Sequence, residues 1–393
     1  MLIRFEVSNF RSIAAPVELS MVAVDRERPA ARDQPLLGES LLPVAAVYGP
    51  NASGKSNVVA ALGWLRDGVA HSLRNWEQDI PTEPFAFGSW PSRSVEFTYE
   101  AVVDGVRFEY LLEIDGSRVG YEALFHYPEK KRRRIFERMG KELKLQRGLG
   151  ALSGTRELLT DRTLALSVAR RFDEPVVTGF ATELSRIAVQ GLHLNPKTWH
   201  TPTAAWFEAD RERGLALAML KLADLGIDEV VFDYPEPDFR RIWLVHNTTA
   251  GSAPLNIVEE SAGTRAWFRM IGPVLTALRQ GSLLVCDELD ASLHPTLSAQ
   301  LIELFHDPVT NPRGAQLVFT SHDTSLLNHL NRDEVWLTEK NPDGSTRLGA
   351  LADFAGERVR KSQNLENAYL HGRFGALPQL DQAELLRELG LIG

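Results

Sequence analysis

The sequence predicts an α/β fold with a mixed sheet, an antiparallel β subdomain and a helical insertion. Three patterns carry this prediction. Apolar runs at residues 42–48 and 283–286 have the length and bounds of buried strands, and a helical apolar period follows the first run. Apolar residues alternate over residues 95–125 around two Asp-Gly pairs, which is typical of an antiparallel meander. Residues 156–225 have a helical pattern and separate these strands from a second α/β half.

The remaining elements follow the same two periods. We expect a strand pattern over 2–24 with a turn at 9–12, strands within 229–246, a helix at 262–279, a strand at 282–286, a helix at 297–305, a strand at 316–320 and a helix at 381–389. We expect four regions: an N-terminal half of the core at 1–127, a mainly helical insertion at 128–240, a C-terminal half of the core at 241–345 and a small C-terminal segment at 346–393.

A glycine-rich loop joins the first buried strand to the helix that follows it. Its sequence, Gly-Pro-Asn-Ala-Ser-Gly-Lys-Ser, fits the phosphate-binding pattern G-x-x-x-x-G-K-[ST] at every position. In this pattern backbone N–H groups and the positive end of the helix face phosphate oxygens. Lys55 would reach the β- and γ-phosphates, and the Ser56 hydroxyl would ligate Mg²⁺. We therefore expect these residues to hold a nucleoside triphosphate: Gly49, Pro50, Asn51, Ala52, Ser53, Gly54, Lys55, Ser56 and Asn57.

The composition is that of an ordinary globular protein and limits the function classes. The net charge of −9 disfavours a protein coated in nucleic acid, although a local basic groove stays compatible with it. The single cysteine, Cys286, cannot form an internal disulfide, which suits a reducing compartment. No apolar run is long enough to span a bilayer, and the N-terminus lacks a signal-peptide core. We therefore expect a cytoplasmic protein with no membrane partner.

Two carboxylates end the strand at residues 283–286. The segment Leu-Leu-Val-Cys-Asp-Glu has the form of the acidic element that accompanies a phosphate loop. In such a site Asp287 holds Mg²⁺, and Glu288 acts as the general base that polarises the attacking water. Two solvated acids at the end of a strand produce the same pattern, but the phosphate loop favours the catalytic interpretation.

The spacing of these two elements separates the classes of phosphate-loop protein. Lys55 and Asp287 are 232 positions apart, which is much further than AAA+ modules place the corresponding residues. The guanine-reading pattern N-K-x-D of Ras-like GTPases is absent from the sequence. A long insertion between two halves is typical of ABC-type ATPases, in which three further loops complete the site.

Three segments occur in the order that those loops require. The segment Glu-Ser-Ala-Gly-Thr-Arg opens a helix ahead of the acidic strand, where Ser261 and the backbone of Gly263 would bind a γ-phosphate. An ordinary serine N-cap is the alternative interpretation. Asp290 lies in the turn after the acidic pair and matches a D-loop aspartate. His322 follows the next strand, where it would contact the γ-phosphate; a structural or solvated histidine is the alternative.

Taken in order, these motifs resemble the ABC-type ATPases of the SMC/RecF/OLD-like group. The N-terminal pattern Phe-x-Val-x-Asn-Phe-Arg-Ser at residues 5–12 is typical of that group. The sequence is also similar to stand-alone bacterial AAA family ATPases of anti-phage defence systems, of the RloA, PARIS AriA and Septu PtuA kind. The shared segments are G-P-N-A-S-G-K-S, E-S-x-G-T-R, D-E-L-D-x-S-L-H-P and the segment G-R-F-G-A-L-P at residues 372–378.

The resemblance implies that two copies close around ATP and Mg²⁺, so that the phosphate loop of one faces Ser261 of the other. ATP would favour the closed homodimer, or a higher homo-oligomer, and hydrolysis would open it. Arg11 is implied to lie near the nucleotide. Two features depart from the group: no Q-loop residue can be placed, with Gln78 as the nearest candidate, and the insertion lacks the length and heptads of SMC coiled-coil arms.

Three functions fit these features. We favour an ATP-hydrolysing sensor or scaffold that controls a separately encoded effector, a nuclease, in anti-phage defence, because the sequence has no nuclease-like or zinc-binding pattern. A RecF-like repair or recombination ATPase and an ATP-binding scaffold with little turnover are the alternatives. The basic run at residues 130–134 leaves DNA contact open, although we favour a solvated hairpin loop there, and an acidic partner protein is a third interpretation.

Overall fold

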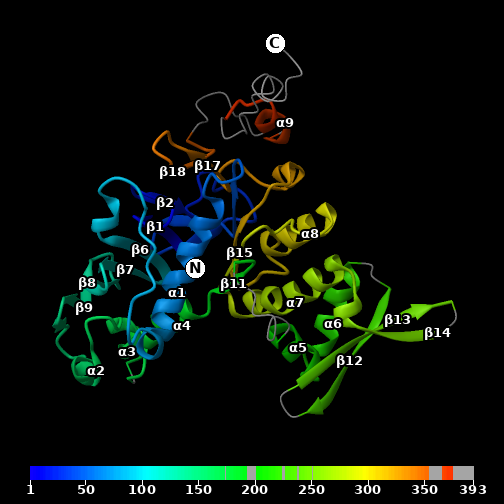
Figure 1. The fold of residues 1–393 in the computed structure, drawn as a ribbon, viewed down its shortest axis with the longest axis horizontal. Coiled ribbons are helices and arrows are strands. Elements are labelled where there is room, and N and C mark those ends of the chain that lie inside the picture. The colour runs from blue at the N-terminus through cyan, green and yellow to red at the C-terminus, as the bar shows by residue number, and fades with distance from the viewer. Residues whose placement is uncertain are drawn as a thin grey trace.

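The computed structural model describes residues 1–172, 174–192, 201–223, 226–236, 239–249, 251–353 and 365–374, and Figure 1 shows its α/β architecture. A six-stranded sheet in the order β11-β15-β16-β5-β17-β18 carries the phosphate loop. Adjacent strands of this sheet are parallel, except for the antiparallel pair β17–β18. The strands are β5 (Val44–Tyr48), β11 (Ala188–Gln190), β15 (Leu283–Cys286), β16 (Gln316–Thr320), β17 (Val335–Lys340) and β18 (Thr346–Ala350).

The six-stranded sheet is buried on both faces. Ala45 and Val47 of β5 pack into one core with helix α1 (Lys55–Asn75). Val44, Ala46 and Tyr48 pack into a second core, which also contains α7 (Ala262–Gln280) and α8 (Pro295–His306). A parallel strand that is covered on both sides is apolar at every position. This explains why the first apolar run of the sequence shows no alternation.

A seven-stranded antiparallel sheet in the order β10-β9-β8-β7-β6-β1-β2 forms the second layer and contains the predicted meander. It is longer than expected, because β9 and β10 form a further hairpin around Gly140, which has a positive φ of 55°. The strands are β1 (Leu2–Ser8), β2 (Val17–Ser20), β6 (Val95–Val103), β7 (Val106–Asp115), β8 (Arg118–Tyr127), β9 (Arg133–Met139) and β10 (Glu142–Leu145).

The stretch expected to be mainly helical, 128–240, therefore begins with strands. Its helices are α2 (Thr155–Leu158), α3 (Ala165–Ala169), α4 (Pro175–Ser185), α5 (Thr201–Glu208) and α6 (Arg213–Leu222). A separate three-stranded antiparallel sheet follows, and Figure 1 shows it projecting beside α5 and α6, away from the meander. It consists of β12 (Ile227–Glu236), β13 (Phe239–Thr248) and β14 (Gly251–Asn256), of which β14 was not expected.

The C-terminal expectations are only partly covered by the described residues. The segment expected from residue 346 begins with β18, which belongs to the six-stranded sheet, and continues with α9 (Leu365–Leu370). The expected helix at 381–389 and residues 375–378 of the shared G-R-F-G-A-L-P segment lie outside the described residues. A small hairpin of β3 (Arg32–Gln34) and β4 (Glu39–Leu41) completes the strands named here. The four region boundaries stay predictions.

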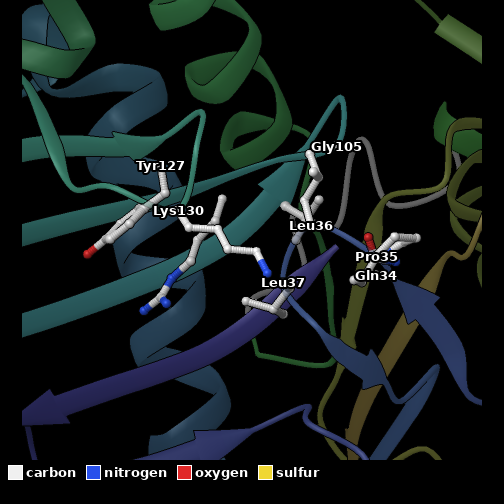
Figure 2. Close-up of a pocket in the computed structure, with 9 residues that line it drawn as sticks. Gln34, Pro35, Leu36, Leu37, Gly105, Tyr127 and Lys130 are labelled. Carbon is white, nitrogen blue, oxygen red and sulfur yellow. The ribbon is translucent and has the colours of Figure 1, made fainter.

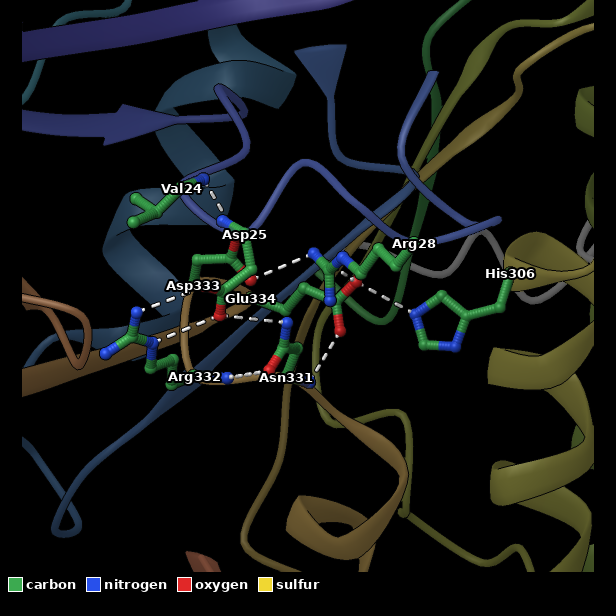
Figure 3. Close-up of polar contacts among 8 residues, drawn as sticks. All are labelled: Val24, Asp25, Arg28, His306, Asn331, Arg332, Asp333 and Glu334. Carbon is green, nitrogen blue, oxygen red and sulfur yellow. Dashed lines mark hydrogen bonds and ion pairs between the residues drawn. The ribbon is translucent and has the colours of Figure 1, made fainter. Parts of the chain in front are cut away.

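A buried polar network ties the N-terminal segment to the six-stranded sheet (Figure 3). The Arg28 guanidinium donates a 2.9 Å hydrogen bond to Asp333 and lies 3.3 Å from Glu334. His306 of α8 lies 3.1 Å from the same Glu334 carboxylate. Burial raises the pKa of Asp333, and the nearby Arg28 opposes that rise. Both carboxylates therefore have hydrogen-bond partners. They directly precede β17, at the edge of the sheet opposite the phosphate loop.

A second buried pair joins the meander to the helices after it. Glu122 of β8 and Arg138 of β9 are fully buried, and their side chains approach to 3.7 Å. Glu122 accepts hydrogen bonds from the backbone N–H groups of Ala165 and Leu166 at 2.6 and 2.8 Å, and so holds the first turn of α3. Burial raises the pKa of Glu122 and lowers that of Arg138. The pair stabilises the fold only while both partners are present.

We predict that Arg138→Met lowers the midpoint of thermal unfolding by several degrees. The substitution leaves Glu122 buried without its cationic partner, and breaking such a pair costs about 3–5 kcal/mol. The matched control is Arg133→Met, which removes an arginine paired with Glu129 at the surface, where an ion pair contributes about 0–1 kcal/mol. Equal midpoints for the two variants would contradict the role given to the buried pair.

Candidate nucleotide-binding site

The predicted site residues meet at one edge of the six-stranded sheet. The phosphate loop follows β5, the acidic pair follows β15, and the loop with His322 follows β16, which lies between β15 and β5. The carboxyl ends of parallel strands point to the same edge, where open α/β sheets bind their ligands. The electrostatics agree, because Asp287, Glu288 and Asp290 all act on the pKa of Lys55.

The phosphate loop has a backbone that requires glycine at two positions. Gly49 has φ 151° and Gly54 has φ 104°, both in the region that favours glycine. A Cβ at Gly49 would overlap the Thr338 hydroxyl, and one at Gly54 would overlap the Thr346 hydroxyl. The loop is thus pressed against β17 and β18, and its shape leaves no room for a side chain at either glycine.

Hydroxyl groups hold the loop from that side. The Thr338 hydroxyl lies 2.6 Å from the Ser53 hydroxyl and donates to the carbonyl of Tyr48 at 3.1 Å. The Thr346 hydroxyl donates to the carbonyl of Ser53 at 2.9 Å and lies 2.7 Å from the Ser12 hydroxyl. The sequence interpretation missed both threonines, because each lies about 300 positions from its loop partner and belongs to no phosphate-loop pattern.

The side chains of Asn57 and Arg11 bind other parts of the same chain. The Asn57 side chain donates a 2.7 Å hydrogen bond to Ser12, so it braces the loop from the N-terminal hairpin. The Arg11 guanidinium pairs with Glu83 at 2.9 Å. Within the described residues no hydrogen bond joins Arg11 to the loop, and Ser12 is the residue of this turn that reaches it.

Lys55 lies inside the loop. Its side chain is 5% exposed, and its ammonium group donates to the carbonyl oxygens of Gly49 and Pro50 at 2.9 and 3.0 Å. Burial lowers the pKa of Lys55, whereas the carboxylates of the acidic segment oppose that shift. The position places one cation against two backbone carbonyls of the loop, as a phosphate loop with its lysine predicts.

The acidic pair is oriented by Thr320 at the end of β16. The Thr320 hydroxyl donates to one carboxylate oxygen of Asp287 at 2.7 Å and accepts from the backbone N–H of Glu288 at 2.7 Å. Glu288 has a positive φ of 53° and an exposed side chain, while Asp287 is half-buried. A non-glycine residue in this backbone region carries strain, which is common where a side chain must be aimed for function.

The predicted D-loop and switch residues contact each other. The backbone N–H of His322 donates to the Asp290 carboxylate at 3.3 and 3.4 Å. The His322 side chain is exposed. This contact joins the turn after Glu288 to the loop after β16 within one chain.

The predicted signature segment begins α7. Ser261 is the N-cap of this helix and accepts from the backbone N–H of Thr264 at 3.1 Å. A Cβ at Gly263 would lie 3.0 Å from the carbonyl oxygen of Ser292, which places the signature segment beside the D-loop. Within the described residues no hydrogen bond joins Ser261 or Gly263 to the phosphate loop of the same chain.

A further glutamine lies at the site and was missed. Gln190 ends β11, beside β15, and its carbonyl accepts from the N–H of Asp287 at 2.9 Å. Gly191 follows with φ 90°, and a Cβ there would overlap the Asp287 carbonyl. Gln78, the candidate named from the sequence, lies just after α1 and its C-cap at Trp76, at the far end from the loop. The sequence signal that could have identified Gln190 is a Gln-Gly pair directly after the short apolar run Ile-Ala-Val.

The basic run at residues 130–134 does not form an open cationic surface. Its three arginines each pair with a local carboxylate: Arg132 with Glu109, Arg133 with Glu129 and Arg134 with Glu137, at 2.8, 2.9 and 2.9 Å. Lys130 lies beside Tyr127 and Leu37 in the wall of a pocket of about 300 Å³ (Figure 2). The arrangement favours the solvated hairpin that the sequence interpretation preferred.

For the ATP hydrolysis that the sequence predicts, we expect Thr320→Val to lower turnover about 10- to 100-fold, because Asp287 is the predicted metal ligand and groups that orient such a ligand have effects of that size. Thr320→Ser keeps the hydroxyl and serves as the matched control, with turnover near the parent rate. The check is the rate of phosphate release over a range of Mg²⁺ concentrations. Parent-like turnover of the valine variant at every Mg²⁺ concentration would rule out the orienting role.

No helix within the described ranges combines the length and the apolarity that crossing a bilayer requires. No curated protein matches the chain. Among solved structures, it is similar to an SmcHead bound to the C-winged helix domain of ScpA, with 13% identity, 90% of this chain and 99% of that chain covered, and a TM-score of 0.48.

Two further structures have the same identity of 13%. For the SMC head domain from Thermotoga maritima, 89% of this chain and 98% of that chain are covered, with a TM-score of 0.42. The other is an Smc head domain with an extended coiled coil, bound to the C-terminal domain of ScpA derived from Pyrococcus furiosus. Here 90% of this chain and 97% of that chain are covered, with a TM-score of 0.43.

One family model covers the site from β5 to the segment after His322. It is described as "AAA domain, putative AbiEii toxin, Type IV TA system" and matches residues 44–328. The match takes in the phosphate loop, the signature segment, the acidic pair and the D-loop, and it spans well over half of the chain. The chain therefore belongs to this family of AAA domains.

Proposed function

We propose that this chain binds ATP with Mg²⁺ at the loop of residues 49–56 and hydrolyses it between two copies of the chain. The observation that carries the proposal is the meeting of Lys55 with the acidic pair at one edge of the sheet, although 232 positions separate them. Loops with a lysine, a metal-binding aspartate and a base are the parts that phosphoryl transfer to water requires.

The residues present fit a triphosphate. The two glycines leave the backbone free to face phosphate oxygens, and the Lys55 ammonium has carbonyl partners that phosphate oxygens would replace. The oxygens of Asp287 and Ser56 are the hard donors that Mg²⁺ prefers. Thr320 occupies one Asp287 oxygen and leaves the other for the metal. Bound Mg²⁺ would neutralise charge on the β- and γ-phosphates.

The chain's own groups then have separate tasks. Glu288 would accept a proton from the attacking water, and its exposed carboxylate after a strained residue suits that task. His322 would contact the γ-phosphate from the loop after β16. Asp290, which is also predicted to contact the nucleotide, accepts from the backbone N–H of His322 and would so position that loop.

We propose that a second copy of the chain completes the site, because the signature segment is separate from the phosphate loop of its own chain. Ser261 is exposed at the N-terminus of α7, where N–H groups and the helix dipole suit a γ-phosphate. A two-fold pairing would bring it to the partner's Lys55 and produce two composite sites. ATP would then stabilise the closed homodimer through contacts that ADP lacks.

We predict that Glu288→Gln lowers kcat for ATP about 10²- to 10⁴-fold, the usual contribution of a general base, while ATP still binds. Glu142→Gln changes an exposed glutamate of β10 and is the matched control, which keeps the parent rate. Phosphate release and binding of a fluorescent ATP analogue measure the two properties. Unchanged turnover of the Glu288 variant would remove this residue from the base role.

We predict that Ser261→Arg blocks ATP-dependent dimerisation and leaves ATP binding by the separate chain nearly unchanged. The long cation would fill the position of the γ-phosphate and disrupt the N-cap of α7. Ser252→Arg on β14 adds the same charge at another exposed serine and serves as the control. Sedimentation with ATP and binding of the analogue report the two effects; simultaneous loss of both would contradict a partner site at Ser261.

We further propose that this ATPase is a sensor or scaffold that controls a separately encoded nuclease in anti-phage defence. Support comes from membership in a family of AAA domains described through a toxin–antitoxin system, together with motifs shared with anti-phage ATPases. We predict that the native gene locus restricts phage plating and that Lys55→Ala abolishes the restriction. A locus that gives equal plaque counts with the parent and variant genes would contradict a defence role that depends on ATP.

A further inference from the structure

Four arginines gather at the end of α1 that is far from the phosphate loop. Helices α1, α3 and α4 contact one another there, as Figure 1 shows. The C-terminal ends of these three helices contribute the side chains. They line a pocket of about 450 Å³, here termed the arginine pocket, which consists of Arg74, Arg170, Arg171, Thr182, Ser185 and Arg186.

The charges of the arginine pocket have no close counter-ion. Within the described residues, no carboxylate lies within 4.0 Å of any of the four guanidinium groups. One acid, Glu183, acts on Arg186 from a distance, but its carboxylate faces the amino group of Met1 at 4.0 Å. The basic run at 130–134 differs, since each of its arginines has a carboxylate partner.

Helix dipoles do not balance this charge. Each helix C-terminus carries the equivalent of at most about −0.5 charge, so three C-termini together supply about −1.5. The four arginines carry +4, and most of this charge is left unbalanced. Helix α3 has only five residues and contributes less than about −0.5. The pKa of Arg170 is lowered by burial and then by its neighbours Arg171 and Arg74, as expected for like charges in one place.

The pocket is organised before any ligand arrives. Arg170 is half-buried and donates a 2.8 Å hydrogen bond to the Ser185 hydroxyl. Ser185 in turn donates to the carbonyl of Ala181 at 2.6 Å, which fixes its direction. The Arg74, Arg171 and Arg186 side chains are exposed around this fixed centre. A rigid cation within a ring of accessible cations suits a multiply charged anion.

The chemistry of the lining selects phosphate. Guanidinium groups bind phosphate oxygens through two parallel hydrogen bonds, and the Thr182 hydroxyl offers a single further donor. The lining has no aromatic or aliphatic side chain on which a nucleobase would stack. Recognition would therefore act on phosphate groups and ignore whatever they are attached to.

We propose that the arginine pocket binds a ligand with two or more neighbouring phosphate groups, supplied by a free polyphosphate or by the backbone of a nucleic acid. This site is separate from the candidate nucleotide site, because α1, with Lys55 at its first residue and Arg74 in its last turn, is about 30 Å long. The inference does not depend on ATP hydrolysis.

The test uses the full chain carrying Lys55→Ala, so that the phosphate loop does not contribute. Sodium tripolyphosphate is titrated by calorimetry, and a labelled 20-base-pair DNA duplex of arbitrary sequence is titrated by fluorescence anisotropy, at about 50 and 200 mM salt. We expect at least one probe to bind, with affinity that falls as salt rises. Binding of tripolyphosphate alone would identify a free polyphosphate as the ligand, and binding of the duplex would identify a nucleic-acid backbone.

Adding Arg170→Gln and Arg186→Gln should weaken that binding at least tenfold, because each substitution removes a cation and its charge-assisted hydrogen bonds to phosphate. Arg133→Gln removes one paired surface arginine and should change the affinity less than twofold. If the double variant fails to fold, the exposed pair Arg74→Gln and Arg171→Gln replaces it. The proposal is overturned if neither probe binds, or if the pocket variants bind as tightly as the Lys55→Ala parent.

Discussion

The parallel pairing of β16 between β15 and β5 is the constraint on which the rest of the structure depends. Val318 and Phe319 pair with Val285 and Cys286 on one side and with Ala45 and Ala46 on the other. This register brings a loop near residue 50 to acids near residue 287. Both faces of the sheet are buried, so each strand holds its position through hydrophobic contacts as well as hydrogen bonds. The geometry of the site follows from that core. Thr320, the last residue of β16, joins the two directly through its hydrogen bonds to the acidic pair.

Charge is distributed in three distinct ways around this core. The candidate nucleotide site sets one buried cation, Lys55, against three acids, which suits it to an anion and a metal. The buried carboxylates of Asp333 and Glu122 each lie beside an arginine, and these contacts join layers of the fold. Among the residues that the structure describes, the charged side chains that line the arginine pocket are all cationic. Helix α1 connects it to the nucleotide loop, so one rigid element carries a cationic group at each end.

Sequence reasoning found the parts of the site that have strong local patterns. The loop of residues 49–56 and the acids at 287–288 were predicted because glycine spacing and an apolar run ending in carboxylates are contiguous signals. Thr338 and Thr346 were missed, since their hydrogen bonds to the loop join positions far apart in the chain. Gln190 was missed because its strand has only three residues. The hairpin β9–β10 was assigned to the helical insertion because its charged residues hide the alternation, although its buried positions pack on the meander.

The central claim is that each working site combines the phosphate loop of one copy with the signature segment of another. Complementation tests it most directly: Lys55→Ala and Ser261→Arg chains are each inactive by this account, and mixing them forms heterodimers with one intact site of two. Neither variant closes with a copy of itself by this account, so the closed dimers in the mixture are heterodimers, and turnover rises to at most about half of the parent value. If the mixture stays as inactive as its separate components while heterodimers form, the composite site is contradicted.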